Sequence, residues 1–312
     1  MLARLQQFTT LSLLAAAVLW AAWFTTTGRP VWAGVGAALI VFGYALFLAI
    51  EFVLVWWVHG DDPAPRATVA QLFKAWVGET LTAPRVFCWQ QPFRSQRVPD
   101  FLPSATERRG VVLVHGFVCN RGLWNRWTLQ LRAQGVPFVA VNLEPVFGSI
   151  SDYAPIVEAA VKRIQQETGQ LPVLVGHSMG GLAIRAWSAA FAGTERVHRV
   201  ITIGSPHRGT WLGRFGTSRN AREMATGTDW QRELEAKESS QHFERFTCFY
   251  SHCDNIVFPA SNATLPGADN RHVVGSAHVQ LLDQPEVLNE VLVWLRPVSS
   301  PAVAADAAVL AR

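Results

Sequence analysis

The sequence predicts a mostly parallel α/β domain, with helices on both faces of its sheet, preceded by a two-helix transmembrane hairpin. Three observations lead to this fold class. The chain has 27 Lys and Arg and 23 Asp and Glu, yet only Arg4, Arg29 and Glu51 lie in the first 58 residues. From about residue 108 onward, continuous apolar runs of strand length alternate with helix-length segments, which is typical of buried parallel sheets. A glycine-rich turn around Ser178 joins one of these strands to the following helix.

The overall composition excludes several classes of protein. Of the 312 residues, 50% are hydrophobic and only 16% are charged, so the chain is neither disordered nor a collagen-like or disulfide-rich miniprotein. The net charge of +4 comes without basic runs or interleaved aromatic residues, which argues against a nucleic-acid partner. The uneven distribution of charge points instead to a membrane.

Two apolar runs, residues 8–27 and 31–58, are separated only by Gly28, Arg29 and Pro30. About 20 apolar residues suffice to cross the hydrocarbon core of a bilayer, and Gly and Pro interrupt helices. Residues 1–58 are therefore expected to form an antiparallel hairpin with both ends on one side of the membrane. Five tryptophans lie near the predicted ends of the runs, at the headgroup level that this side chain favours: Trp20, Trp23, Trp32, Trp56 and Trp57.

A secretory signal peptide is the alternative interpretation of the N-terminus. The second apolar run argues against it, as does the lack of a clean small-x-small cleavage site before that run. The orientation of the hairpin is weakly determined. The positive-inside rule gives a small bias toward a cytoplasmic N-terminus and main domain, because the basic residues flanking the runs are few and partly balanced by Asp61 and Asp62.

Residues 59–105 contain six prolines and are expected to be a connector with one short helix at 69–77. The α/β domain is expected over 106–297, and a disordered tail over 298–312 because that segment is rich in Ala, Val, Ser and Pro. Apolar runs predict strands at 110–114, 136–143, 171–175, 197–203, 246–250 and 272–274. Helical periodicity predicts helices at 123–134, 152–168, 179–191 and 285–295.

Ser178 is the candidate nucleophile. Residues 176–180 read Gly-His-Ser-Met-Gly and fit G-x-S-x-G, between the predicted strand 171–175 and the predicted helix 179–191. This is the context that the nucleophile motif requires, and the helix N-terminus favours negative charge. An ordinary glycine-rich turn is the alternative.

The strand 110–114 ends in His115, Gly116 and Phe117, where a second part of an acyl-transfer site is expected. A tetrahedral oxyanion needs two backbone donors, and the N–H groups of Phe117 and Met179 are the candidates. His115 is expected to be a structural partner of this turn rather than a general base.

A base and a carboxylate should follow Ser178 in the chain order acid, then histidine. His278 lies in a loop after the predicted strand 272–274, at the edge of the sheet where ligands bind, and is the candidate base. Asp254 follows the strand 246–250 and is the candidate acid that orients it, with helix capping as the alternative role. The glutamates at 223, 233, 235, 238 and 244 lie in a charged segment and are expected to be solvated.

Five segments, in this order, resemble the α/β-hydrolase superfamily over roughly residues 108–296, and within it the bacterial triacylglycerol lipases and esterases. They are VVLVHGF, LVGHSMGG, ITIGSPHRGT, YSHCDNIVFP and SAHVQLL. The resemblance implies that His207 and Thr210 shape the acyl pocket, with His115 and His177 as further pocket candidates. It also implies a lid or cap at 211–242, although that segment is short and charged compared with a large apolar flap.

The resemblance implies a serine hydrolase that cleaves carboxylic esters. The two apolar runs are not part of the usual pattern of this family, and they are the reason to expect a membrane-anchored enzyme, located in a bacterial inner membrane. Its expected partners are an ester or lipid substrate and the bilayer, and neither a metal nor an organic cofactor is expected. A thioesterase or acyltransferase using the same triad is the alternative, and a non-catalytic membrane adaptor is a third. The cysteines at 88, 119, 248 and 253 lack zinc-site spacing, and free thiols are favoured over a Cys248–Cys253 disulfide.

Overall fold

The central element of the computed structural model is a parallel sheet with strand order β2-β1-β3-β4-β5-β6. The structure describes residues 1–103, 106, 108–238 and 240–296, so the expected tail at 298–312 lies outside the described residues. The strands are β1 (Val111–Val114), β2 (Phe138–Ala140), β3 (Val173–His177), β4 (Arg199–Ile203), β5 (Phe246–Tyr250) and β6 (Asp269–His272).

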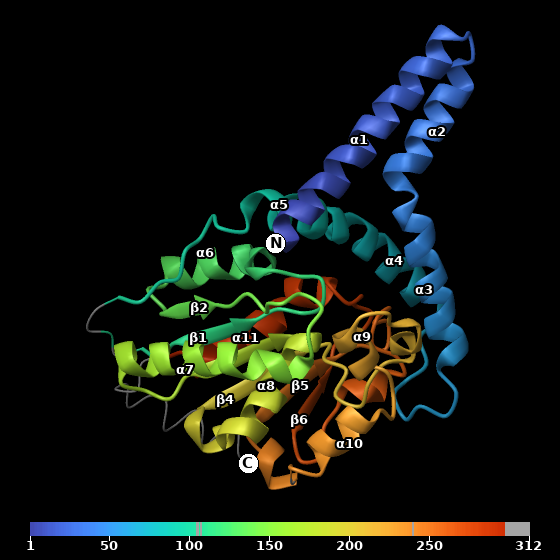
Figure 1. Cartoon of the computed structure of the whole chain (residues 1–312). Coiled ribbons are helices and arrows are strands. Elements are labelled where there is room, and N and C mark those ends of the chain that lie inside the picture. The colour runs from blue at the N-terminus through green and yellow to red at the C-terminus, as the bar shows by residue number, and fades with distance from the viewer. Residues whose placement is uncertain (104–105, 107, 239, 297–312) are drawn as a thin grey trace.

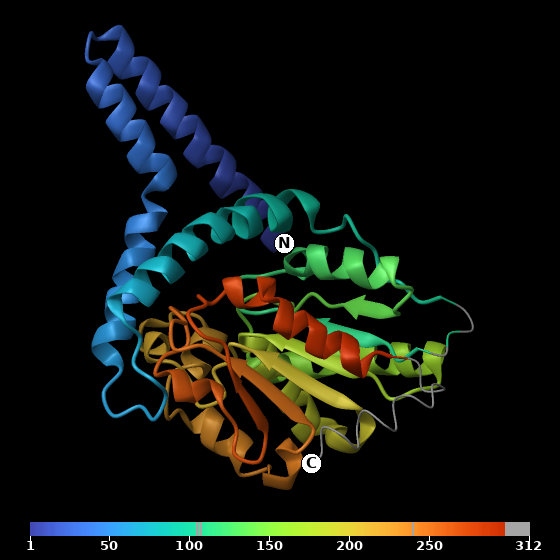
Figure 2. The ribbon, with the colours of Figure 1, turned by 180° about the vertical axis from the view of Figure 1, so that it is seen from behind.

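Helices cover both faces of this sheet, as the alternation of side chains along β1 shows. Val112 and Val114 pack in one core with α7 (Ala154–Thr168) and α8 (Met179–Phe191), which lie in front in Figure 1. Val111 and Leu113 point the other way, into a second core with α6 (Asn125–Ala133) and α11 (Pro285–Trp294). Figure 2 shows α11 on that opposite face. The predicted α/β fold class is confirmed.

The N-terminal helices α1 (Leu2–Thr26) and α2 (Pro30–Phe42) run antiparallel and project away from the α/β domain (Figure 1). Trp20 Nε1 donates a hydrogen bond to the backbone oxygen of Trp32 at 2.8 Å, which joins the two helices near their connecting turn. Among the described residues, α1 is the single helix that is by itself long and apolar enough to cross a membrane.

The second apolar run is not the continuous helix that the sequence predicts. It consists of α2 and α3 (Tyr44–Val58), which meet at Gly43 with a bend of 52°, and the two would make a second candidate span only if taken as one broken helix. Beyond the bend, Phe52 and Val55 of α3 pack with Phe258 and Ala277 of the α/β domain. Because of the bend, α3 packs against the α/β domain, whereas α2 projects away from it (Figure 1).

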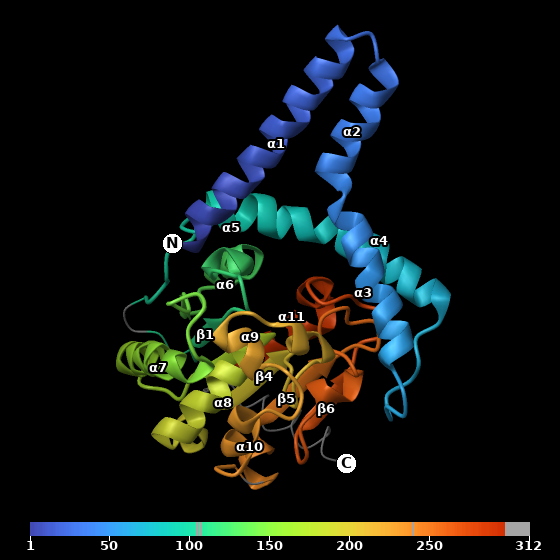
Figure 3. The same cartoon turned by 45° about the vertical axis from the view of Figure 1, so that its right-hand side comes forward.

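The segment after α3 contains more helix than the short stretch expected at 69–77. It forms α4 (Val69–Pro84), a π-helical turn and α5 (Gln91–Arg94) without interruption. Pro84 has no N–H, so it cannot bond the carbonyl of Thr80 one turn earlier. The hydroxyl of Tyr44, on α3, donates to that carbonyl at 2.8 Å instead. Figure 3 shows the result, in which α1, α2 with α3, and α4 with α5 form three sides of a triangle above the sheet.

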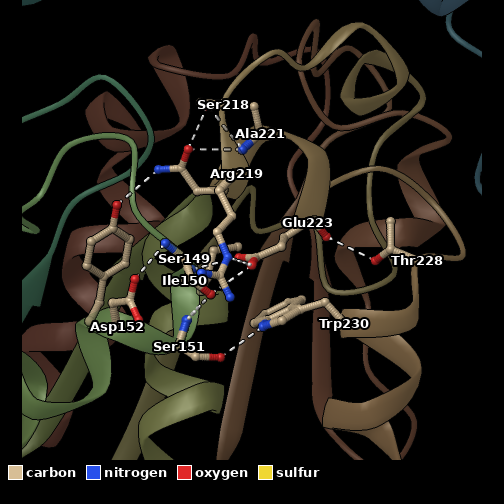
Figure 4. Close-up of polar contacts among 12 residues, drawn as sticks. Ser149, Ile150, Ser151, Asp152, Ser218, Arg219, Ala221, Glu223, Thr228 and Trp230 are labelled. Atoms are coloured by element: carbon tan, nitrogen blue, oxygen red, sulfur yellow. Dashed lines mark hydrogen bonds and ion pairs between the residues drawn. The ribbon is translucent and has the colours of Figure 1, made fainter.

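The segment 211–242 is attached to the domain by polar contacts, of which those of Glu223 are buried. It contains α9 (Arg219–Glu223) and α10 (Asp229–Glu235). The Glu223 carboxylate accepts hydrogen bonds from Ser149 Oγ and the Ile150 N–H, both at 2.7 Å, and Trp230 Nε1 donates to Ser151 Oγ at 2.9 Å (Figure 4).

Two glutamates of this segment differ from the expectation that they are solvated. Glu223 is buried against the loop at Ser149 and Ile150. Glu238 forms a buried, two-pronged ion pair with Arg185 of α8. The charged composition of 211–242 misled the prediction because these carboxylates are neutralised or hydrogen-bonded by partners elsewhere in the chain.

Candidate active site

Ser178 lies on the turn between β3 and α8, with φ of 55° and ψ of −128°. This left-handed φ is uncommon for a residue other than glycine and marks a strained position. The turn is closely packed, since a Cβ on Gly180 would lie 2.3 Å from the carbonyl oxygen of Val114. The sharp turn thus places Ser178 beyond the carboxyl end of the sheet, directly before the N-terminus of α8.

Asp254 and His278 come from the loops after β5 and β6 and are hydrogen-bonded to each other. His278 Nδ1 lies 2.9 Å from both carboxylate oxygens of Asp254, so this nitrogen carries the proton and donates it. Asp254 Oδ1 also accepts the N–H groups of Ile256 and Val257 at 2.8 Å each. Asp254 therefore fixes the tautomer and orientation of the imidazole.

The charge state of His278 follows from its surroundings. Its burial would by itself lower its pKa, but the adjacent carboxylate of Asp254, with a further contribution from Glu79, raises the pKa above the ordinary histidine value. Ser178 and His278 line the same cavity. The structure therefore brings the three predicted residues Ser178, His278 and Asp254 to one site.

The candidate oxyanion donors flank Ser178. Gly116 passes so close that a Cβ on it would lie 2.8 Å from Ser178 Cβ, and Phe117 lines the same cavity as Ser178. Met179 is the first residue of α8. His115 holds the turn from behind, because its Nδ1–H donates to the Gly116 carbonyl and its Nε2 accepts the Leu143 N–H. Burial lowers the pKa of His115 to about 4, which keeps that imidazole neutral.

Of the residues expected to shape the pocket, His177 lines the cavity of Ser178 and the others lie outside it. His177 lines the cavity, and its Nε2–H donates to the backbone oxygen of His278 at 3.3 Å. His207 is fully buried and hydrogen-bonded to Thr202, while the Thr210 hydroxyl donates to the Ile256 carbonyl. Neither His207 nor Thr210 lines the cavity at Ser178, nor does His115. His115 and Thr210 reach the site through their hydrogen bonds to Gly116 and Ile256, which do line the cavity, whereas His207 lies against Thr202 of β4.

Two carboxylates from α3 and α4 that the sequence did not single out are connected to the loop of His278. Glu79 of α4 accepts the N–H groups of Val279 at 3.1 Å and Gln280 at 3.2 Å, and its burial raises its pKa to about 7. Glu51 of α3 accepts a hydrogen bond from Asn255 Nδ2 at 2.7 Å.

Asn255 links Glu51 to the backbone of His278, because its Oδ1 accepts the His278 N–H at 3.2 Å. A signal for Glu51 was present in the sequence, since a lone carboxylate in an apolar run is rarely without a functional or structural partner. Both glutamates line the cavity of Ser178.

That cavity has a volume of about 810 Å³, within the range of ligand sites. Its floor contains Gly116, His177, Ser178 and His278, and its walls come from helices α1 to α4. Within the described residues, no group of three or more His, Cys, Asp or Glu side chains is arranged to hold a metal ion. The four cysteines are free thiols, of which Cys88 and Cys119 line the cavity.

Comparison with known proteins agrees with this architecture. Residues 111–247 match the model of the alpha/beta hydrolase family. Among solved structures, the chain is similar to a Bacillus licheniformis lipase, BlEst2, in its mature form, with 18% identity, a TM-score of 0.53, and coverage of 62% of this chain and 94% of that one. It is also similar to the propeptide form of that lipase, with 19% identity, a TM-score of 0.53, and coverage of 63% of this chain and 52% of that one. The protein therefore has the α/β-hydrolase fold.

Proposed function

We propose that the protein is a membrane-anchored serine hydrolase that cleaves carboxylic esters. The observation that carries this proposal is the convergence of residues from four connections at the carboxyl ends of the strands. They are the Gly116–Phe117 turn after β1, the strained Ser178 after β3, Asp254 after β5 and its partner His278 after β6. The similar fold of the Bacillus licheniformis lipase also supports an ester substrate.

In this proposal, His278 Nε2 removes the proton of Ser178 Oγ as that oxygen attacks the ester carbonyl. The C–O bond to the alcohol then breaks, the imidazolium gives its proton to the leaving alcohol, and an acyl-Ser178 remains. Water next attacks this acyl-enzyme while His278 Nε2 takes one of its protons. The bond between the acyl carbon and Ser178 Oγ then breaks, the imidazolium returns its proton to Oγ, and the carboxylic acid is released. Asp254 stabilises the imidazolium in both steps through its hydrogen bond to Nδ1.

Negative charge on the carbonyl oxygen is stabilised in this proposal by the backbone N–H groups of Phe117 and Met179. Such donors act on charge that develops in the transition state, and removing one typically costs about 10²–10³ in rate. The N-terminus of α8, where Met179 lies, adds the favourable end of a helix dipole.

The anchoring part of the proposal depends on α1 and α2. Large apolar side chains along both helices are exposed, including those at positions 8, 11, 18, 19, 23, 31, 35 and 39. A soluble protein rarely exposes such an extended apolar surface. We expect the protein to remain in the pellet when membranes are washed with carbonate at high pH, and protease protection of the α/β domain would identify the side on which it lies.

The decisive test of activity is a panel of 4-nitrophenyl esters from acetate to palmitate, assayed with wild type, Ser178→Ala and Ser151→Ala. Ser151 is exposed and lies outside the cavity, so its variant is the matched control. Wild type and Ser151→Ala should hydrolyse at least one ester, and Ser178→Ala should lose kcat on the order of 10⁶-fold. Equal activity in all three would overturn the proposal, whereas acyl transfer to an added alcohol in preference to water would favour an acyltransferase.

A further inference from the structure

The cavity at Ser178 changes in character along its length. Five buried polar side chains lie at its floor: Glu51, Glu79, His177, Ser178 and His278. The walls above are formed mainly by apolar side chains from α1, α2, α3 and α4, including Leu13, Leu14, Ile40, Phe47 and Ala83. A molecule that fits this lining has a polar, reactive end and a long apolar part.

The helices present regular faces to this cavity. From α1 come Thr10, Leu13 and Leu14, and from α3 come Tyr44, Phe47, Leu48 and Glu51. Both sets recur at intervals of three and four residues, so each is one continuous face of its helix. On α3 this face leads from apolar residues down to Glu51 at the floor. The N-terminal helices are thus part of the site as well as an extension from it.

The end of the cavity far from Ser178 is open. Leu14 is 50% exposed and Phe47 is 63% exposed, although both line the cavity. α4 also carries an apolar stripe outside the cavity, which consists of Val69, Phe73, Val77 and Leu81 at four-residue intervals, and Leu81 is 73% exposed. The helices α1, α2 and α4, which supply lining residues, form three sides of a triangle in Figure 3.

We propose that this cavity is a passage through which a long-chain ester enters the active site directly from the bilayer. The acyl chain lies between α1, the α2–α3 bend and α4, and the ester carbonyl reaches Ser178 at the floor. The inference rests on the proposed ester hydrolysis and adds to it the substrate class, a bilayer-resident lipid ester, and its route.

The dimensions of the hairpin agree with this route. The 13 residues of α2 span about 20 Å, less than the ~30 Å of the hydrocarbon core. The bend at Gly43 and the exposed apolar stripe of α4 therefore come to lie at or within the near side of the bilayer when the hairpin is inserted. The mouth of the cavity then faces lipid chains rather than water.

The direct test is a fluorophosphonate with a long alkyl chain and a diazirine at the chain end, applied to the full-length protein in vesicles. After attachment to Ser178, illumination crosslinks the chain end to its neighbours, which peptide mass spectrometry identifies. Crosslinks to residues 10–14 or 40–48 are expected. Crosslinks confined to 211–242, or to the α/β domain alone, would overturn the passage, while failure to label Ser178 at all would overturn the proposed function itself.

A matched pair of variants supplies an independent readout. Ala83→Trp adds bulk inside the passage, whereas Ala70→Trp makes the same change at an exposed position of the same helix, outside the cavity. For Ala83→Trp we expect kcat/KM for the palmitate ester to fall at least about tenfold relative to the acetate ester. Ala70→Trp should keep the wild-type ratio. A ratio unchanged in Ala83→Trp, with hydrolysis of both esters intact, would contradict the passage but leave the esterase activity standing.

Discussion

Glu79 accepts the backbone N–H of Val279 at 3.1 Å, which connects α4 to the loop that carries His278 across 200 residues of sequence. The second oxygen of Glu79 accepts the Gln280 N–H, so a single carboxylate holds two successive amides next to the candidate base. A second carboxylate, Glu51 of α3, is connected to the same loop through Asn255, which donates to Glu51 and accepts the His278 N–H. The N-terminal helices therefore contribute directly to the position and charge of His278.

This relationship predicts a change in the pH dependence of hydrolysis. The Glu79 carboxylate contributes to the raised pKa of His278, and protonated His278 cannot accept the proton of Ser178. Activity is therefore lost as the pH falls through the raised pKa. In Glu79→Gln the acidic limb of the kcat/KM profile should move to lower pH, measured with a soluble ester. Glu167→Gln, at an exposed position, should keep the wild-type limb, and an unmoved limb in Glu79→Gln would refute the influence of Glu79.

Replacing Asp254 by asparagine should inactivate the enzyme without unfolding it. The amide keeps the size of the carboxylate but no longer enforces Nδ1–H on His278 or stabilises the imidazolium. In serine protease triads the equivalent change lowers kcat on the order of 10⁴-fold, and a similar loss is expected here. Asp229→Asn is the control, since that side chain is 88% exposed. Ester turnover by Asp254→Asn within tenfold of wild type would exclude the assigned role.

Glu223→Ala should lower stability through the contacts shown in Figure 4. The substitution leaves the Ser149 hydroxyl and the Ile150 N–H without their acceptor, at a cost of about 1–3 kcal/mol. For a domain of this size each kcal/mol lowers the apparent Tm by about 2–4 °C. Glu235→Ala removes an exposed carboxylate from the same segment and should leave the Tm unchanged. Equal Tm values for the two variants in thermal denaturation would show that the segment is held by other contacts.

The sheet and the candidate triad could be predicted from the sequence because their signals are local. Buried strands read as apolar runs, and the turn at Ser178 has its glycines at fixed spacing between a strand and a helix. The last strand was predicted three residues late. The prediction relied on the apolar pair at 273–274. The strand β6 is instead an edge strand, and its residues Asp269–His272 are largely exposed and polar, so they lack the apolar pattern of a buried strand.

The features above the sheet depend on contacts between distant parts of the chain, which local patterns do not reveal. The bend at Gly43 separates two segments that are equally apolar, so hydropathy carries no sign of it. The helix expected at 69–77 continues through Pro84 instead, where the Tyr44 hydroxyl donates to the carbonyl that Pro84 leaves unpaired. Glu79 became part of the site only through its contacts with Val279 and Gln280.

The central claim is that Ser178 is the nucleophile, and the most direct measurement is the mass of the protein after reaction with a fluorophosphonate, followed by peptide mapping. One adduct per chain, located on Ser178 and absent from Ser178→Ala, is the predicted result. Labelling at a pH low enough to protonate His278 should slow the formation of this adduct in wild type. An adduct on any other residue, or the same labelling in Ser178→Ala, would contradict the account.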